Sequence, residues 1–179
     1  MQQALHGVDI RSRDIGRMLD QFGDLVMTLS MRILNDRMMA EEATQDTFIK
    51  VYKGLHEFRE EASLKTWIYR IAYRTAIDYA RKKKRHSVLT EIDHKIEAGY
   101  EDSDVHNEIQ VNERTSCLQQ AIDCLPPDQA ALISLYYLEE KNVKEVCEVT
   151  GLTESNVKIK LFRARKSLKG KLADTKNIY

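Results

Sequence analysis

The chain has 179 residues, with 28 Lys and Arg balanced by 28 Asp and Glu, which is enough for one medium-sized domain or two small ones. It contains two prolines and seven glycines and is rich in Leu, Ile, Lys, Arg and Glu, a composition that favours an all-α fold. The apolar runs are short and broken by charge, which excludes a membrane span. The N-terminus lacks the features of a signal peptide, so we expect a cytoplasmic protein.

The zero net charge hides a strong segregation along the chain. Residues 1–85 carry 16 basic and 12 acidic side chains, residues 86–115 carry 2 and 8, and residues 116–179 carry 10 and 8. Two mildly basic segments therefore flank an acidic one. Together with the helical periodicity described below, this pattern divides the chain into an N-terminal domain at 9–86, a flexible acidic linker at 87–110 and a C-terminal domain at 111–179, and such segregated charge bears on the partners of the chain.

The first two predicted elements are amphipathic helices. Apolar residues recur at three- and four-residue steps over 15–34 and again over 38–55. Asp36 is the expected N-cap of the second helix, and Gly54 lies near its end.

A third helix is predicted over 63–85. Its expected buried stripe spans roughly 80° of a helical wheel, and three arginines, Arg70, Arg74 and Arg81, lie on the opposite side. Trp67 lies off the stripe on the basic side, so it either closes an edge of the core or contacts a partner. The stripe consists of Leu64, Ile68, Ile71, Ala72, Thr75 and Tyr79.

Periodicity is lost over 86–111 and returns until Pro126-Pro127, which ends one helix and begins the next. From Asn142 a short helix is followed by Gly151 and then by a longer helix with Thr153 as its N-cap. Gly151 permits the left-handed backbone of a tight turn. This arrangement predicts a helix-turn-helix.

The outward face of the last helix combines polar groups near its start with a high density of cations. Such a face suits DNA, because cations neutralise phosphates while polar side chains at the helix start contact base edges. The alternative is a solvated basic helix that ends a bundle. The candidate DNA-binding residues are Ser155, Asn156, Lys158, Ile159, Lys160, Phe162, Arg163 and Arg165.

Three segments together resemble a known family. FREEASLKTWIYRIAYRTAIDYARKKKR (58–85) resembles the promoter-melting and minus-10-reading segment of extracytoplasmic-function (ECF) RNA polymerase sigma factors. AEEATQDTFIKVYKGL (40–55) resembles the helix that these proteins dock on the polymerase clamp, and residues 125–168 resemble their minus-35-reading domain. The resemblance implies two helical domains, core RNA polymerase and promoter DNA as partners, and an anti-sigma factor as a regulator.

The resemblance also implies roles for individual residues. Gln45, Asp46 and Phe48 match the clamp-docking helix, although Phe48 also fits the apolar stripe of that helix. Residues 59–63 match the loop that captures a flipped base, and residues 82–85 form a cationic run that suits the duplex backbone or is simply solvated. The implied minus-10 set is Arg59, Glu60, Glu61, Ala62, Ser63, Trp67, Arg70, Arg74 and Arg81.

Three positions depart from the family pattern. Glu60 stands where glycine is common, Arg74 where asparagine is common, and Ile159 where a small polar residue is usual. An isoleucine in a recognition helix favours a thymine methyl over a hydrogen-bonded base edge. The promoter sequence is therefore not predictable from the resemblance.

Two other functional classes are alternatives. An autonomous helix-turn-helix repressor or activator with an N-terminal sensing or dimerisation domain would explain 125–168 but not 58–85. An enzyme is not expected, because no nucleophile–base pair, phosphate loop or carboxylate dyad stands out. The three cysteines are expected to be reduced thiols; they are Cys117, Cys124 and Cys147. The five histidines are scattered without the spacing of a metal site, so neither a metal nor a cofactor is expected.

Overall fold

The computed structural model describes residues 3–58, 62–93 and 113–176, with side chains at 15–58, 62–85 and 118–172. The described residues form helices and no strand, so the predicted all-α fold is confirmed. In chain order, the elements are α1 (Gln3–Leu34), α2 (Arg37–Gly54), the 3₁₀ turn Leu55–Glu57, α3 (Leu64–Asp93), α4 (Glu113–Asp123), α5 (Pro127–Ile133), the π-helical turn Ser134–Leu138, α6 (Val143–Thr150) and α7 (Glu154–Lys176).

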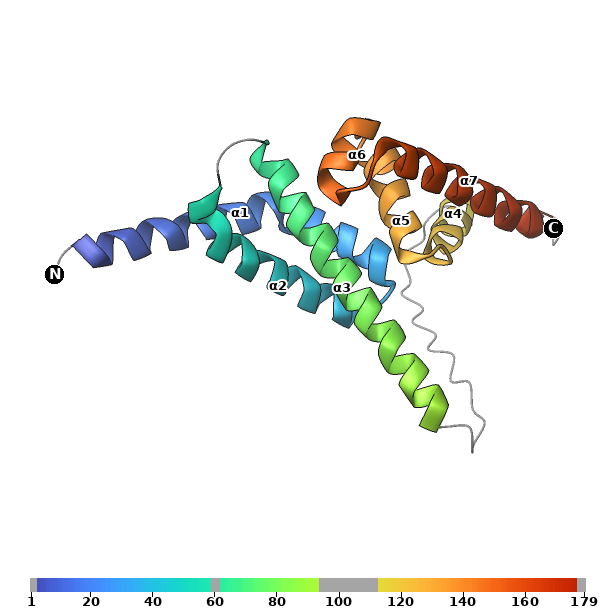
Figure 1. Cartoon of the computed structure of the whole chain (residues 1–179), viewed down its shortest axis with the longest axis horizontal. Coiled ribbons are helices and arrows are strands. Elements are labelled where there is room, and N and C mark those ends of the chain that lie inside the picture. The colour runs from blue at the N-terminus through green and yellow to red at the C-terminus, as the bar shows by residue number, and fades with distance from the viewer. Residues whose placement is uncertain (1–2, 59–61, 94–112, 177–179) are drawn as a thin grey trace.

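Helices α1, α2 and α3 pack against one another as a three-helix unit, here called the N-terminal domain (3–93) (Figure 1). Each helix contributes an apolar stripe to one core, as the periodicity predicts. Its most deeply buried apolar side chains include Phe22, Val26, Leu29, Ile33, Ala43, Phe48, Val51, Ile68 and Ala72.

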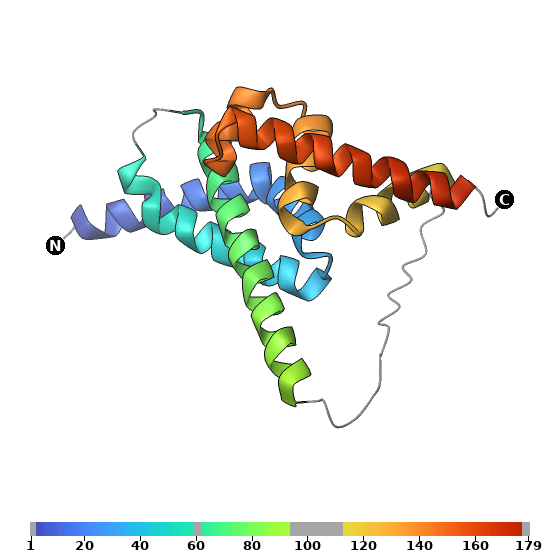
Figure 2. The ribbon, with the colours of Figure 1, turned by 45° about the vertical axis from the view of Figure 1, so that its right-hand side comes forward.

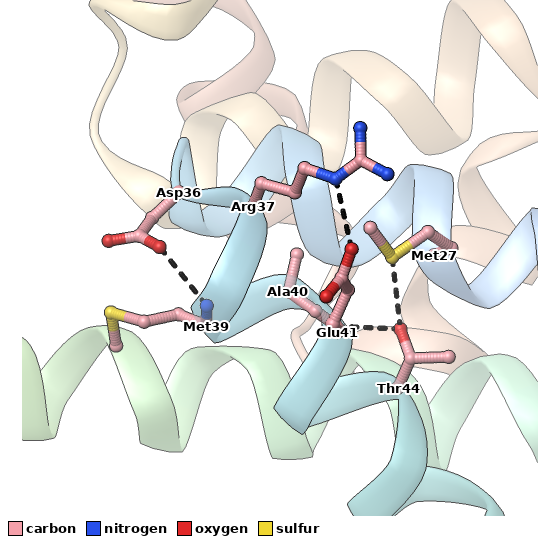
Figure 3. Close-up of polar contacts among 7 residues, drawn as sticks. All are labelled: Met27, Asp36, Arg37, Met39, Ala40, Glu41 and Thr44. Carbon is pink, nitrogen blue, oxygen red and sulfur yellow. Dashed lines mark hydrogen bonds and ion pairs between the residues drawn. The ribbon is translucent and has the colours of Figure 1, made fainter. Parts of the chain in front are cut away.

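The turn between α1 and α2 is fixed by local hydrogen bonds (Figure 3). The Asp36 carboxylate accepts a hydrogen bond of 3.1 Å from the backbone N–H of Met39, which confirms the predicted N-cap. One turn later, the Thr44 hydroxyl bonds the carbonyl of Ala40 at 2.7 Å and lies 3.6 Å from the sulfur of Met27 in α1. These contacts set the entry of α2 against α1.

Helix α3 differs from its prediction in length and in burial. Ser63 caps its start by accepting a hydrogen bond of 3.1 Å from the N–H of Thr66, but the helix continues to Asp93, beyond the expected end near Arg85. The first residues of the expected flexible linker, 87–93, are therefore helical, while residues 94–110 of it lie outside the described part. Tyr69 and Tyr73, outside the predicted stripe, are also buried.

The C-terminal domain (113–176) contains α4 to α7. Pro126 precedes α5 and Pro127 occupies its first turn, where a missing N–H costs nothing. The buried face of α5 meets α7, while α6 packs beside α7. The core includes Ile122, Leu125, Ala131, Leu132, Leu135, Val146, Val149, Val157 and Leu161.

The two domains are in contact. Helix α6 lies against α3, and α5 lies against α1 and α3, and Figures 1 and 2 show α6 beside the first half of α3 while the last turns of α3 extend away. This packing covers Tyr69 and explains why α3 is buried on a second face. In the described ranges, no helix has the length and hydropathy needed to cross a membrane.

Candidate nucleic-acid interface

The predicted helix-turn-helix is present and its turn is closed by defined hydrogen bonds. Gly151 has φ 75°, and its N–H donates to the carbonyl of Cys147 at 2.8 Å. Asn142 and Glu145 form a reciprocal capping box at the start of α6. Thr153 accepts a weak hydrogen bond of 3.4 Å from the N–H of Asn156 at the start of α7.

The angle between α6 and α7 is held by small and β-branched side chains. Val146 and Val149 of α6 and Val157 of α7 are fully buried where the helices meet, and Ala164 allows close approach further along. Cys147 is partly buried beside them, and burial is the main cause that raises the pKa of its thiol. The pair is therefore a rigid frame that positions the outward face of α7.

The outward face of α7 presents most of the predicted DNA-binding residues to solvent. Ile159 is 48 % exposed and Phe162 is 65 % exposed, which is unusual for large apolar side chains. Lys158 is exposed and pairs with Glu154 at 3.2 Å. The other exposed members of the predicted set are Ser155, Asn156, Arg163 and Arg165.

Lys160 lies differently from the rest of this set. It is half-buried and forms an ion pair with Asp128 at the start of α5. Together with Leu152 it lines a cavity at the boundary with the N-terminal domain. Its side chain is therefore directed away from the exposed face that Ile159 and Phe162 define.

A second cationic surface lies on the later part of α3. Arg74, Arg81 and residues 82–85 are exposed, and Arg81 pairs only loosely with Asp78 at 3.4 Å. Lys83 reaches Asp36 at 3.1 Å. The exposure of residues 82–85 fits both alternatives given for them, contact with a duplex backbone and solvation.

Trp67 of α3 is partly buried against the end of α2. Its ring lies 5.1 Å from the ring of Phe58, centre to centre, and a Cβ at Gly54 would lie 3.3 Å from it. These contacts favour the packing alternative for Trp67. Of the loop predicted to capture a flipped base, Arg59, Glu60 and Glu61 lie outside the described residues, whereas Ala62 and Ser63 lead into α3.

Arg70 is engaged by the C-terminal domain. Its Nε donates a hydrogen bond of 2.9 Å to the carbonyl of Glu148 in α6. In this arrangement, Arg70 is not free to contact DNA, although the sequence places it in the minus-10 set.

The predicted clamp-docking residues of α2 divide into exposed and buried positions. Gln45 is exposed and Asp46 pairs with Lys50 at 3.1 Å, but Phe48 is only 6 % exposed and belongs to the core. Phe48 is therefore not a surface anchor in this structure, and the packing alternative describes it. Ile49 and Tyr52, 50 % and 42 % exposed, are large apolar groups that the second half of α2 presents to solvent, and Met38 at the start of α2 is 75 % exposed. The sequence analysis missed Ile49 and Tyr52, although they share a helix face with Gln45 at spacings of four and seven.

A helix-turn-helix with a cationic outer face, joined to a second helical domain with its own cationic surface, defines a DNA-binding protein of transcription. The chain matches the family models "Sigma-70 region 2" over residues 18–86 and "Sigma-70, region 4" over residues 115–168. It is 30 % identical over 139 residues to "ECF RNA polymerase sigma factor SigM" of Bacillus subtilis, covering 78 % of this chain and 83 % of SigM. The chain belongs to the ECF family of RNA polymerase sigma factors, and its function is in transcription initiation.

Other sigma factors and solved structures are similar to this chain over most of its length. The chain is 29 % identical over 170 residues to "Probable RNA polymerase sigma factor" of Haemophilus influenzae, covering 87 % of this chain and 88 % of that protein. Its fold is similar to that of the sigma factor RpoE solved with the anti-sigma factor NepR from Bartonella quintana (TM-score 0.70, 20 % identity, 90 % and 98 % coverage). It is also similar to CnrH solved with the cytosolic domain of CnrY (TM-score 0.61, 18 % identity, 91 % and 90 % coverage).

Proposed function

We propose a division of labour between the two domains. The N-terminal domain binds core RNA polymerase through the exposed face of α2 and opens and reads the minus-10 element with α3 and the loop before it. The C-terminal domain reads the minus-35 element with the outward face of α7. The observation that carries this proposal is the exposed, cationic and partly apolar face of α7 on a rigid helix-turn-helix.

The residue types on the two cationic surfaces support distinct roles. Residues 82–85 give α3 a run of four cations suited to phosphates, while Ser155 and Asn156 at the start of α7 are placed where recognition helices contact base edges. A polymerase that holds both domains raises the effective concentration of the second contact once the first has formed. Neither domain then needs tight binding by itself.

We also propose partners and a location. An anti-sigma factor is proposed as a regulator, because the sigma factor RpoE, which has a similar fold, was solved with the anti-sigma factor NepR. The protein is proposed to act in the cytoplasm, where polymerase and promoters are found, and to be a regulatory subunit without catalytic activity of its own.

In vitro transcription with bacterial core polymerase on a randomised promoter library tests the proposal. Start sites that depend on the added protein and share two sequence elements are expected. The absence of such start sites, with active polymerase shown by another sigma factor, would overturn it.

A paired variant tests the domain assignment. Lys158→Ala with Arg163→Ala removes two exposed cations of α7 and should abolish dependence on the minus-35 element while core binding survives. Arg17→Ala with Lys169→Ala removes the same two residue types elsewhere and should leave that dependence intact. Loss of core binding in the first variant would mean that the domains are assigned wrongly.

A further inference from the structure

A cavity of about 620 Å³ lies at the boundary of the two domains, and this volume is within the range of small-molecule binding sites. The end of α1, the middle of α3, the start of α5 and the helix-turn-helix all contribute side chains to it. This space is here called the boundary cavity. Its apolar lining includes Ile33, Leu34, Ile77, Ala80, Pro127 and Leu152.

Positive charge exceeds negative charge around the boundary cavity. Lys160 pairs with Asp128, the carboxylate of the lining, and Lys83 pairs with Asp36 at 3.1 Å. Lys84 has no ion pair among the residues that the structure describes. Because cations prevail, the cavity favours an anion over a neutral or cationic molecule. The cations of the lining are Arg81, Lys83, Lys84 and Lys160.

Tyr73 supplies a buried hydrogen-bond donor to the same cavity. Its side chain lines the cavity and is 8 % exposed, and its hydroxyl has no hydrogen-bond partner within the described ranges. Burial, followed by the Asp128 carboxylate, raises the pKa of Tyr73, although Arg81 opposes the shift. The phenol is therefore protonated at neutral pH. A buried hydroxyl without a partner is costly, and an accepting oxygen of a ligand would offset that cost.

We propose that the boundary cavity binds a small organic anion, a molecule with an apolar body and one carboxylate, sulfonate or phosphate group. The body packs against Ile77 of α3 and Leu152 of the helix-turn-helix. An oxygen of the anionic group accepts a hydrogen bond from Tyr73 and lies near Lys84. A DNA phosphate would meet the same cations, but it would leave the apolar lining without a partner, so the combination favours a small molecule.

A ligand in the boundary cavity acts on the proposed DNA contact. Arg81, Lys83 and Lys84 belong both to this cavity and to the cationic surface of α3. A bound anion neutralises part of that charge and weakens contacts with phosphates. This regulatory consequence rests on the proposed function, whereas the binding site itself does not.

Anilinonaphthalenesulfonate, which joins an aromatic body to one sulfonate, is the probe for the full chain. Its fluorescence should rise to saturation at a single site. Phenylnaphthylamine has the same rings without the sulfonate and should bind about tenfold more weakly, because charge-assisted contacts are lost. Equal binding of the two compounds would overturn the anionic part of the proposal. Displacement of the probe by equally low concentrations of inorganic sulfate would overturn the apolar part.

Two variants should change the affinity for the probe in opposite directions. Tyr73→Phe keeps the ring and removes the donor, so it should weaken binding about fivefold. Asp128→Asn removes a carboxylate and frees Lys160, so it should tighten binding several-fold. Tyr79→Phe and Asp123→Asn make the same changes outside the cavity and should bind the probe like the wild type. Changes of the same sign in both cavity variants, or equal changes in the controls, would overturn the proposal.

Methyl NMR spectra of the wild-type chain locate the probe even where a variant fails to fold. The methyl resonances of Ile77 and Leu152, one from each domain, should shift when the probe is added. Those of Ile122 and Leu138, which line another apolar cavity in the C-terminal domain, should stay in place. Shifts confined to Ile122 and Leu138 would overturn the assignment of the site.

Transcription provides the functional readout. The probe should reduce transcription that depends on this chain, more strongly in Asp128→Asn and less strongly in Tyr73→Phe, while transcription directed by another sigma factor on the same core polymerase should not change. Binding of the probe without an effect on transcription would overturn the regulatory consequence. Absence of transcription before any probe is added would instead contradict the proposed function, while fluorescence and NMR would still report on the site.

Discussion

The ammonium group of Lys141 lies 4.8 Å from the centre of the Tyr69 ring, while the hydroxyl of Tyr69 has no hydrogen-bond partner in the described part of the chain. Burial, followed by the nearby Glu139 carboxylate, raises the pKa of this phenol. Tyr69 is therefore neutral wherever the protein is folded under ordinary conditions. The contact with Lys141 is made by the ring of Tyr69.

Replacing Tyr69 separates the contributions of ring and hydroxyl. Tyr69→Phe keeps the ring and removes a buried unpaired polar group, so it should leave the free energy of unfolding unchanged or raise it by up to about 1 kcal/mol. Tyr69→Leu removes the cation–π contact and should lower it by about 1–2 kcal/mol. Urea denaturation followed by circular dichroism measures both. A larger loss of unfolding free energy in Tyr69→Phe than in Tyr69→Leu would show that the hydroxyl has a hydrogen-bond partner.

The N-cap of α2 gives a prediction that depends on pH. The N–H of Met39 is the main cause that lowers the pKa of Asp36, and Lys83 adds to it. Asp36→Ala should reduce the free energy of unfolding by about 1 kcal/mol at neutral pH. Because the folded-state pKa of Asp36 is depressed, its stabilisation is present above the unfolded pKa near 3.8 and is lost as the pH falls through the folded value.

Thermal melts of wild type and Asp36→Ala from pH 7 down to pH 3 check this prediction. The difference in melting temperature between wild type and Asp36→Ala should be constant from pH 7 to about pH 5. It should shrink below the unfolded-state pKa of about 4. Asp24→Ala, which replaces an exposed aspartate within α1, is the control. A difference that grows on acidification would contradict the assigned cap.

The two glycines of the C-terminal domain should respond to alanine with opposite signs. Gly151 has φ 75°, so Gly151→Ala strains the turn and should cost about 1 kcal/mol or more, even though there is space for the added carbon. Gly170 lies within α7 with nothing near its missing Cβ, so Gly170→Ala should stabilise the domain by up to about 1 kcal/mol. Melting temperatures of the two variants check the pair. Destabilisation of similar size in both would contradict the turn geometry.

Sequence periodicity predicted those parts of the fold that depend on local patterns. The cap at Asp36 and the turn at Gly151 were predictable because each backbone geometry favours few residue types: short polar side chains at an N-cap, and glycine at a positive φ. Burial of Tyr69 and Tyr73 was not, because a helical wheel identifies one buried stripe and cannot show that a second domain covers another face. For the same reason, the engagement of Arg70 by Glu148, 78 positions away, had no signal in the sequence.

The site residues of α7 and α2 illustrate the same limit. The residue types of α7 identified a DNA-binding face, but the pairing of Lys160 with Asp128 depends on how α5 packs beside α7. In α2 the assignment of Phe48 to the polymerase contact followed the family resemblance, which does not distinguish it from its neighbour Ile49. Only the packed structure shows which of the two side chains the core has enclosed.

Ile159 gives a prediction about promoter preference. Its side chain is 48 % exposed on the outward face of α7, where an apolar group favours a thymine methyl. If it contacts such a methyl, replacing the contacted thymine of a selected minus-35 element by uracil should reduce wild-type transcription about 4-fold, because burial of one such carbon contributes about 0.8 kcal/mol. Ile159→Ser should be insensitive to the same replacement. Equal sensitivity of both proteins would exclude this contact.

The exposed face of α2 carries the last prediction. Ile49 is 50 % exposed and Tyr52 is 42 % exposed, on the helix face that also carries Gln45. Large apolar side chains on a domain surface contribute strongly to binding free energy when a partner buries them fully. Ile49→Ala with Tyr52→Ala should therefore weaken core polymerase binding at least tenfold while the melting temperature stays close to that of the wild type.

Two other variants separate docking from folding. Leu19→Ala, which truncates an equally exposed side chain on α1, should leave polymerase binding unchanged. Phe48→Ala empties a core position and should lower the free energy of unfolding by about 3–5 kcal/mol, so any loss of binding follows from unfolding. Polymerase affinity and thermal melts measured on the same preparations distinguish these cases. Normal binding by the Ile49 and Tyr52 double variant would mean that the polymerase contacts another face of the N-terminal domain.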